Sequence, residues 1–208
     1  MIALIDYGAG NLTSVRKALT SLGADYMTPA SPSELSGAAG LIVPGVGNFA
    51  ATSALAGAWR ETIRSAVDDG TPLLGICVGM QWLFEGSDEA PGVPGLGVLP
   101  GRVQRLAGDV ERRLKIPHVG WNALDVAAGS RLLRGLSPRP HVYFTHSYAA
   151  PVTAHCVGAA THAGTFAAAV ERDNVFGVQF HPEKSSDAGL QILRNFLEIA
   201  GSTAPGLP

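Results

Sequence analysis

An apolar run that ends at a cysteine constrains the fold of this chain more than any other segment. Residues 72–76 (Pro-Leu-Leu-Gly-Ile) carry no polar side chain, which is typical of a central parallel strand that is covered on both faces. Cys77 follows directly, with Gly75 two residues before it and Gly79 two residues after it. Glycines in this spacing allow a sharp turn from a buried strand into a helix. The run therefore predicts an α/β fold with Cys77 at a strand-to-helix turn.

The rest of the chain supports a mostly parallel central sheet flanked by helices. Apolar runs predict strands at 2–5, 24–28 and 41–43, while helical spacing predicts helices over 12–22, capped by Asn11 or Thr13 and closed by Gly23, and over 59–67. From Gly92 the helical signals become sparse, which predicts an antiparallel extension of the sheet. The segments expected there are strands at 103–106, 114–116, 141–144, 166–170 and 175–180, a short helix at 131–136 and a closing helix at 190–199. We expect a single domain over residues 1–200 and a tail at 201–208.

Length and composition exclude several classes of protein. The chain has 208 residues, 46% of them hydrophobic and 15% charged, so it is too short to contain a (β/α)₈ barrel of about 250 residues beside anything else. Its net charge of −2 offers no strong field for nucleic acid or an anionic membrane. No apolar stretch approaches about 20 residues, and the first residues do not resemble a signal peptide. Two cysteines are too few for a disulfide scaffold, so we expect a reducing cytoplasm.

A cysteine and a distant histidine are candidate catalytic residues. At the predicted turn Cys77 would lie at the N-terminus of a helix, which favours the thiolate, although a buried inert cysteine is the alternative. His181 and Glu183 lie two residues apart, so in an extended chain their side chains project to one side. His181 could then take a proton from Cys77 while Glu183 orients the imidazole. Each motif alone has an ordinary structural explanation, and their combination favours catalysis.

Backbone donors for an oxyanion are expected at two places. The third predicted strand ends in Pro-Gly-Val-Gly-Asn (44–48), where glycines let backbone N–H groups approach a ligand. The residue after a nucleophile commonly supplies a second donor, which here is Val78. Glycine-rich turns also follow strands without any such role, so this motif has little weight by itself.

These motifs together resemble those of the class I (triad) glutamine amidotransferases. The resemblance rests on Gly-Ile-Cys-Val-Gly-Met-Gln at 75–81, on His-Pro-Glu at 181–183 and on Pro-Gly-Val-Gly at 44–47. It spans nearly the whole chain, whose length suits that domain, and it implies a flavodoxin-like sheet. The resemblance also implies that no cofactor and no metal is needed.

Three further stretches are similar to a narrower group, the glutaminase subunits of imidazole glycerol phosphate synthases from histidine biosynthesis. They are Asp-Tyr-Gly-Ala-Gly-Asn-Leu at 6–12, Pro-His-Val-Gly-Trp-Asn at 117–122 and Tyr-Phe-Thr-His-Ser-Tyr at 143–148. Thr145 stands where members of the group often have valine. The resemblance implies a heterodimer with a (β/α)₈-barrel cyclase subunit, which would use ammonia to convert PRFAR to imidazole glycerol phosphate and AICAR.

The resemblance also implies roles for individual residues. Cys77 would attack the side-chain amide of L-glutamine to form a γ-glutamyl thioester, with His181 as base and then acid and Glu183 holding the imidazole. The oxyanion donors would be the backbone of Val46, Gly47 and Val78, and the Pro-Gly-Val-Gly strand would reorient when the cyclase holds its ribonucleotide. Glutamine would be bound around Gly47, Gln81, Glu89, Ser147 and Tyr148, and the cyclase would meet Asn11, Trp121, Tyr143 and Lys184.

Alternative interpretations remain at this stage. The chain could be the glutaminase of another synthase, such as pyridoxal phosphate synthase, or a catalytically silent module on the same fold. Gln81 could be a solvated helix residue, Glu89 ordinary surface charge, and Lys184 either a gate for ammonia or a charge that balances Glu183. The remaining motifs predict neither a metal set nor a dinucleotide site; they are Cys156 beside His155, the histidines His118, His141 and His162, and Gly8 with Gly10.

Overall fold

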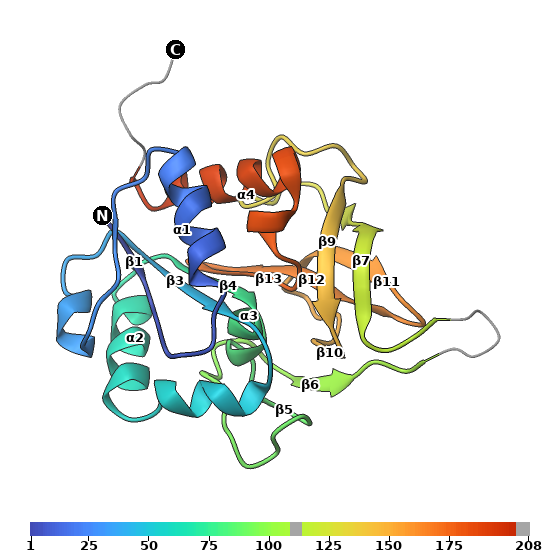
Figure 1. Ribbon diagram of the computed structural model, residues 1–208, viewed down its shortest axis with the longest axis horizontal. Helices are drawn as coiled ribbons and strands as arrows, with labels where there is room; N and C mark the ends of the chain where they lie inside the picture. Colours follow the sequence, from blue (N-terminus) through green and yellow to red (C-terminus); the bar gives the residue numbers. More distant parts are fainter. Residues whose placement is uncertain (109–113, 203–208) are drawn as a thin grey trace.

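The apolar run before Cys77 forms strand β4 (Leu73–Cys77), which lies inside an eight-stranded sheet. The computed structural model describes residues 1–108 and 114–202 of the chain (Figure 1). Every residue of β4 is buried, because a parallel strand lies on each side of it and helices cover the sheet. The strand order is β2-β1-β3-β4-β13-β12-β11-β8. The parallel part of this sheet consists of β1 (Ile2–Leu4), β2 (Tyr26–Met27), β3 (Gly40–Gly45), β4 and β13 (Val175–Val178).

The sheet gains an antiparallel extension beyond β13, which confirms the predicted architecture. Strand β12 (Thr165–Arg172) pairs antiparallel with β13, and β11 (Cys156–Thr161) and β8 (Asp125–Val126) continue the sheet in the same manner. The order 2-1-3-4 followed by a fifth parallel strand is that of flavodoxin-like folds, in which ligands bind beyond the carboxyl ends of the strands.

Helices cover both faces of the sheet. Figure 1 shows α1 (Leu12–Ser21) and α4 (Ser186–Ile199) on one side, and α2 (Ala58–Asp68) and α3 (Val78–Trp82) on the other. Short 3-10 segments occupy Pro32–Leu35, Phe49–Leu55 and Pro182–Lys184. None of the helices in the described part of the chain is long and apolar enough to cross a membrane.

Two small sheets stand beside the large one. Strands β5 (Gly86–Ser87), β6 (Arg102–Arg105) and β10 (Tyr148–Ala149) form one of them. Strands β7 (His118–Ala123) and β9 (His141–His146) form an antiparallel pair, whose register places Trp121 opposite Tyr143. Because β9 runs almost directly into β10, residues 145–148 are held between the two small sheets.

Two predicted elements are wrong. Residues 114–116 do not form a strand beyond a single bridge at Leu114; Pro117 has no N–H to donate, so the pairing with β9 starts at His118. Residues 131–136 form turns instead of a helix. Gly135 has φ +80°, a left-handed conformation that interrupts any helix over these residues.

Other predicted elements are present with different bounds. The second strand is only Tyr26–Met27, the strand expected to reach Phe180 ends at Val178, and the closing helix begins at Ser186 instead of 190. The polar first turn of that helix includes Asp187, whose charge suits a helix N-terminus, but it carries no apolar spacing. The strands β5, β7, β8, β10 and β11 were not predicted. Residues 203–208 of the expected tail lie outside the described residues.

Candidate active site

The turn between β4 and α3 holds Cys77 in a conformation that ordinary residues avoid. Its backbone has φ +54° and ψ −110°, in the positive-φ region that costs energy for any residue with a Cβ. The turn depends on glycine at two places. A Cβ at Gly79 would lie 1.8 Å from the carbonyl oxygen of Val43, and a Cβ at Gly75 would lie 2.6 Å from that of Gly79. This is the sharp strand-to-helix turn that the glycine spacing predicts.

His181 and Glu183 lie side by side after β13, although not in an extended strand as expected. Glu183 belongs to the 3-10 turn Pro182–Lys184, because Pro182 has the φ that suits the first residue of such a turn. The Nδ1 of His181 lies 2.8 Å from Oε1 of Glu183, and both side chains are 1% exposed. The backbone of His181 is fixed as well, since its N–H donates to the carbonyl of Tyr143 and its carbonyl accepts from the Ser185 hydroxyl.

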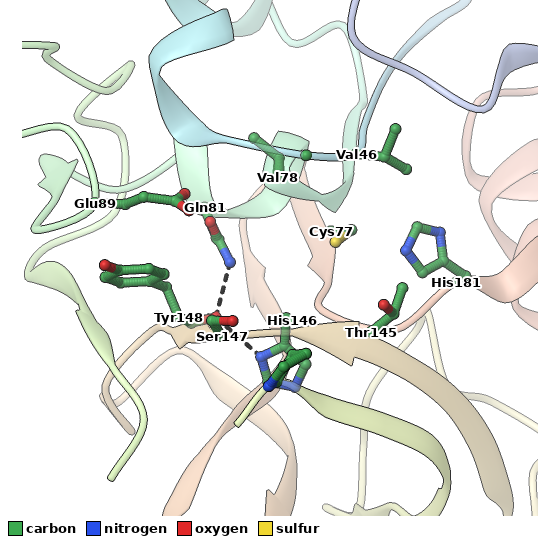
Figure 2. Close-up of a pocket in the computed structure, with 12 residues that line it drawn as sticks. Val46, Cys77, Val78, Gln81, Glu89, Thr145, His146, Ser147, Tyr148 and His181 are labelled. Atoms are coloured by element: carbon green, nitrogen blue, oxygen red, sulfur yellow. Dashed lines mark hydrogen bonds between the residues drawn. The ribbon is translucent and has the colours of Figure 1, made fainter. Parts of the chain in front are cut away.

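The electrostatics of His181 suit a base that acts on a thiol. Burial lowers the pKa of His181, but the nearby Cys77 thiol and the Glu183 carboxylate raise it, with a net rise to about 10. Nδ1 is engaged by Glu183, so Nε2 is the nitrogen that remains to take a proton; it is buried and has no hydrogen-bond partner in the described part of the chain. Figure 2 shows the His181 ring beside the Cys77 sulfur.

A cavity of about 250 Å³ opens over Cys77 and collects most of the predicted site residues. It lies at the carboxyl end of β4, where ligands bind in this class of sheet. The predicted residues that line it are Val46, Gly47, Cys77, Val78, Gln81, Glu89, Ser147, Tyr148 and His181 (Figure 2).

The segment expected to supply oxyanion donors is close to Cys77 but is held by another loop. Gly47 has φ +88°, a conformation that favours glycine. The N–H of Val46 donates to the carbonyl of Ala9 at 3.1 Å. In this conformation the Val46 N–H is therefore already engaged and does not serve an oxyanion.

The side chains of Gln81 and Glu89 are fixed at the cavity wall. Nε2 of Gln81 donates to the carbonyl of Tyr148 at 2.9 Å, while its Oε1 is buried without a hydrogen-bond partner among the described residues. Oε2 of Glu89 accepts from the N–H of Phe49 at 2.8 Å. Neither residue is the solvated surface group of the alternative interpretation.

Three of the four residues assigned to a partner surface, Trp121, Tyr143 and Lys184, lie on and beside the β7–β9 pair. The Trp121 side chain is 53% exposed, and its ring meets that of Tyr143 edge to face with centroids 6.1 Å apart. The Lys184 ammonium lies 5.8 Å from the centre of the Tyr143 ring. Asn11 precedes α1, and its side chain makes no capping hydrogen bond.

Sequence reasoning missed several residues around the cavity. Pro117, Thr145 and His146 also line it. Gln179 is fully buried, and its Nε2 lies 3.7 Å from Sγ of Cys77. The only sequence signal for Gln179 is a polar residue within an otherwise apolar run, 175–180.

The histidines form a hydrogen-bonded chain behind the cavity instead of a metal site. Asn122 Nδ2 lies 3.3 Å from Nε2 of His118, His118 Nδ1 lies 3.0 Å from Nε2 of His146, and His146 Nδ1 lies 2.9 Å from the Tyr148 carbonyl. Since a carbonyl only accepts, Nδ1 of His146 carries a proton, and the remaining donors follow in order with both rings neutral. Burial and neighbouring histidines lower the pKa of His118 to about 3 and that of His146 to about 4.

Among residues 1–108 and 114–202, no group of three or more histidine, cysteine, aspartate or glutamate side chains is placed to hold a metal ion. Both cysteines are free thiols. Cys156 is half-buried, and its Sγ lies 3.3 Å from the carbonyl of Gly158.

Solved structures share this fold. One described as a glutamine amidotransferase has a TM-score of 0.76 at 24% identity and covers 96% of this chain and 98% of its own. PurLQS from Thermotoga maritima has a TM-score of 0.72 at 19% identity, covering 95% of this chain and 97% of its own.

Sequence comparisons identify the family. Three relatives are named imidazole glycerol phosphate synthase subunit HisH. The protein of Methanothermobacter thermautotrophicus is 46% identical, and the match covers 96% of this chain and 98% of the relative. The protein of Geobacillus thermodenitrificans is 48% identical, with 96% of each chain covered. The protein of Gloeobacter violaceus is also 48% identical, with 97% of this chain and 90% of the relative covered. A family model described as glutamine amidotransferase class-I matches residues 3–200. This chain therefore belongs to the class I glutamine amidotransferases.

Proposed function

We propose that this chain is the glutaminase subunit of an imidazole glycerol phosphate synthase. It hydrolyses L-glutamine to L-glutamate and ammonia for histidine biosynthesis. The observation that carries the proposal is the 46–48% identity, over nearly the full length, to relatives named as that subunit. The arrangement of Cys77, His181 and Glu183 in one buried site supports it.

The reaction proceeds through a covalent thioester. The thiol proton of Cys77 first passes to Nε2 of His181, and Sγ, now a thiolate, attacks the side-chain amide carbon of glutamine. His181 then gives this proton to the departing ammonia as the carbon–nitrogen bond breaks, which leaves a γ-glutamyl thioester. Water, activated by the same nitrogen, adds to the thioester and releases glutamate and the free thiol. Glu183 holds the imidazole through its contact with Nδ1.

Several groups at the cavity wall suit the ends of a glutamine molecule. The unpaired, buried Oε1 of Gln81 is an acceptor for the substrate ammonium group. The Glu89 carboxylate supplies a second acceptor, and Gly47, Ser147 and Tyr148 also line the site. Gln81 also donates a hydrogen bond to the Tyr148 carbonyl, so the two residues are held in place before substrate binds.

In this proposal, the rate of glutamine hydrolysis depends on the partner subunit. The Val46 N–H donates to Ala9 and must turn away from it before it can stabilise an oxyanion. A single oxyanion donor contributes about 3 kcal/mol in comparable sites. The resting conformation therefore hydrolyses glutamine slowly, and binding of the cyclase with its ribonucleotide releases the segment.

The partner is a (β/α)₈-barrel cyclase that receives the ammonia and converts PRFAR to imidazole glycerol phosphate and AICAR. Its contact surface includes Trp121, Tyr143, Lys184 and Asn11, of which the first three are clustered. The ammonium of Lys184 lies near the Tyr143 ring, within the proposed contact surface. We place the reaction in the cytoplasm because it requires Cys77 as a free thiol.

The test is the rate of glutamate release from the purified chain. Alone, the chain should release little glutamate, and addition of the cyclase with its ribonucleotide should raise the rate strongly. Cys77→Ser should abolish the reaction in both conditions. A rate that is the same with and without the partner would contradict the coupling. A diazo-ketone analogue of glutamine should label Cys77, and no labelling under conditions that label an active control would favour the silent module.

A further inference from the structure

The side chain of Gln179 contacts the nucleophile from the protein side. It follows β13, its side chain has no exposed surface, and its Nε2 lies 3.7 Å from Sγ of Cys77, within hydrogen-bond distance for sulfur. Gln179 does not line the cavity, so it cannot contact the substrate directly. The reaction described above uses no part of this side chain.

The neighbouring hydrogen bonds determine which end of the Gln179 amide faces the sulfur. Nε2 of Gln81 donates one hydrogen to the carbonyl of Tyr148 at 2.9 Å and the other to Oε1 of Gln179 at 3.1 Å. Because Oε1 of Gln179 is the acceptor in this network, its NH₂ group is the end that faces Cys77. If the Gln179 amide were turned the other way, its NH₂ group would face the NH₂ group of Gln81, and both of these groups are donors.

We propose that Gln179 is a positioning residue that donates a hydrogen bond to the sulfur of Cys77 and joins the nucleophile to Gln81 and Tyr148 in the substrate site. The donor matters most when the sulfur carries a negative charge, because hydrogen bonds to charged acceptors are about twice as strong as neutral ones. It therefore stabilises the thiolate before attack and also fixes the direction of the sulfur. This inference rests on the proposed function of Cys77 as the nucleophile.

Thiol alkylation tests the proposal without any need for glutamine or a partner. The rate at which iodoacetamide modifies Cys77 is measured against pH, with the Cys77 peptide quantified by mass spectrometry so that Cys156 does not contribute. The pH at which the rate reaches half its maximum reports how easily the sulfur becomes charged. A residue that only fills space would not move this midpoint.

Two variants distinguish the loss of the Gln179 N–H donor from a change in the volume of its side chain. Gln179→Met keeps a similar size without the N–H, and we expect its midpoint to rise by about one pH unit, as for the loss of a hydrogen bond to a charged group. Gln179→Glu puts a carboxylate against the sulfur and should raise the midpoint further. Gln191→Glu in α4 makes the same chemical change at a residue outside the cavity wall, and its midpoint should equal that of the parent.

The outcomes distinguish this inference from the proposed function. Unchanged midpoints in both Gln179 variants would overturn the inference, even if the chain proves to be an active glutaminase. Loss of the fold in both variants, seen by circular dichroism at 25 °C, would also overturn it in favour of a purely structural role. Raised midpoints would support it even if the cyclase fails to stimulate glutamate release.

Discussion

In the proposed reaction, Glu183 acts only through another residue, His181. Its carboxylate contacts Nδ1 of His181 at 2.8 Å and does not line the cavity over Cys77. With Cys77, it raises the pKa of His181 to about 10, against the effect of burial. A buried carboxylate that holds an imidazole in one orientation contributes to the rate and little to substrate binding.

Replacement of Glu183 by glutamine tests whether this carboxylate affects the rate of the reaction and not the binding of substrate. Glu183→Gln keeps an oxygen near Nδ1 but removes the charge, so the pKa of His181 should fall. We expect kcat for glutamine hydrolysis by the activated complex to fall by roughly 100-fold or more, with little change in KM. Steady-state kinetics measure both constants, and the exposed Glu61→Gln in α2 is the matched control. A rise in KM at unchanged kcat would contradict the role.

At the scale of elements, the β4–α3 turn is the part of the fold that sequence predicts best. Its geometry is local, because Gly75 and Gly79 meet each other and strand β3 at distances that exclude any side chain. The strand, the helix and the nucleophile are therefore fixed together by a few neighbouring residues.

The turn should tolerate no side chain at Gly79. In Gly79→Ala the new Cβ would lie 1.8 Å from the carbonyl oxygen of Val43, which belongs to the backbone of a buried strand and cannot move aside. We expect a loss of about 3 kcal/mol of unfolding free energy or more. Urea denaturation measures the free energy of unfolding. The control is Gly92→Ala, where a Cβ would meet nothing within 4 Å and stability should change by less than about 0.5 kcal/mol. If Gly79→Ala is as stable as the parent, the turn is adaptable and the prediction is wrong.

We expect two histidines of the β7–β9 pair, His118 and His146, to make stability depend on pH. The pKa of His118 is lowered by burial and by His146 and His162, and that of His146 is lowered by burial and by His162 and His181, although the Tyr148 carbonyl opposes this. Above pH 6.5 both histidines are neutral in the folded and unfolded states. As the pH falls below 6.5, the unfolded chain binds protons that the folded chain does not, so folding stability falls.

This loss of stability can be assigned to single histidines. Each contributes about 1.4 kcal/mol per pH unit until the pH nears its folded pKa of about 3 or about 4. His118→Gln should therefore reduce the slope of stability against pH by about that amount between pH 6 and 5. Urea denaturation at several pH values gives the slope, and His141→Gln, at an exposed residue of the same pair, should leave it unchanged. An unaltered slope in His118→Gln would refute the assignment.

The elements that sequence could not predict share a physical cause. Strands β7, β8 and β11 are partly exposed, and they pair with segments whose distance along the chain no local pattern reveals. Cys77, His181 and Glu183 were recognisable because their chemistry lies in their residue types. Gln179 was not, because its contact with a sulfur 102 residues away exists only in the folded chain.

At the scale of the whole molecule, the cavity over Cys77 and the proposed partner surface lie on connected elements. His181 donates its backbone N–H to the carbonyl of Tyr143 in β9, and Tyr143 faces Trp121 across the β7–β9 pair. The Ser185 hydroxyl donates to the His181 carbonyl and accepts from the N–H of Tyr143. In the proposed complex, a partner on this pair would therefore contact the same backbone that holds His181.

Trp121 should anchor that partner. An aromatic side chain that is 53% exposed at an interface centre commonly contributes 2 kcal/mol or more, so Trp121→Ala should weaken cyclase binding by roughly 30-fold or more. The fold of this chain should be little affected, because Trp121 is more than half exposed. Calorimetric titration measures Kd, and a thermal melt checks the fold. Val152→Ala, at a residue that is also 53% exposed but lies outside the β7–β9 pair, should bind like the parent. If Trp121→Ala binds equally well, the partner sits on another face and the connection through Tyr143 to His181 does not carry the coupling.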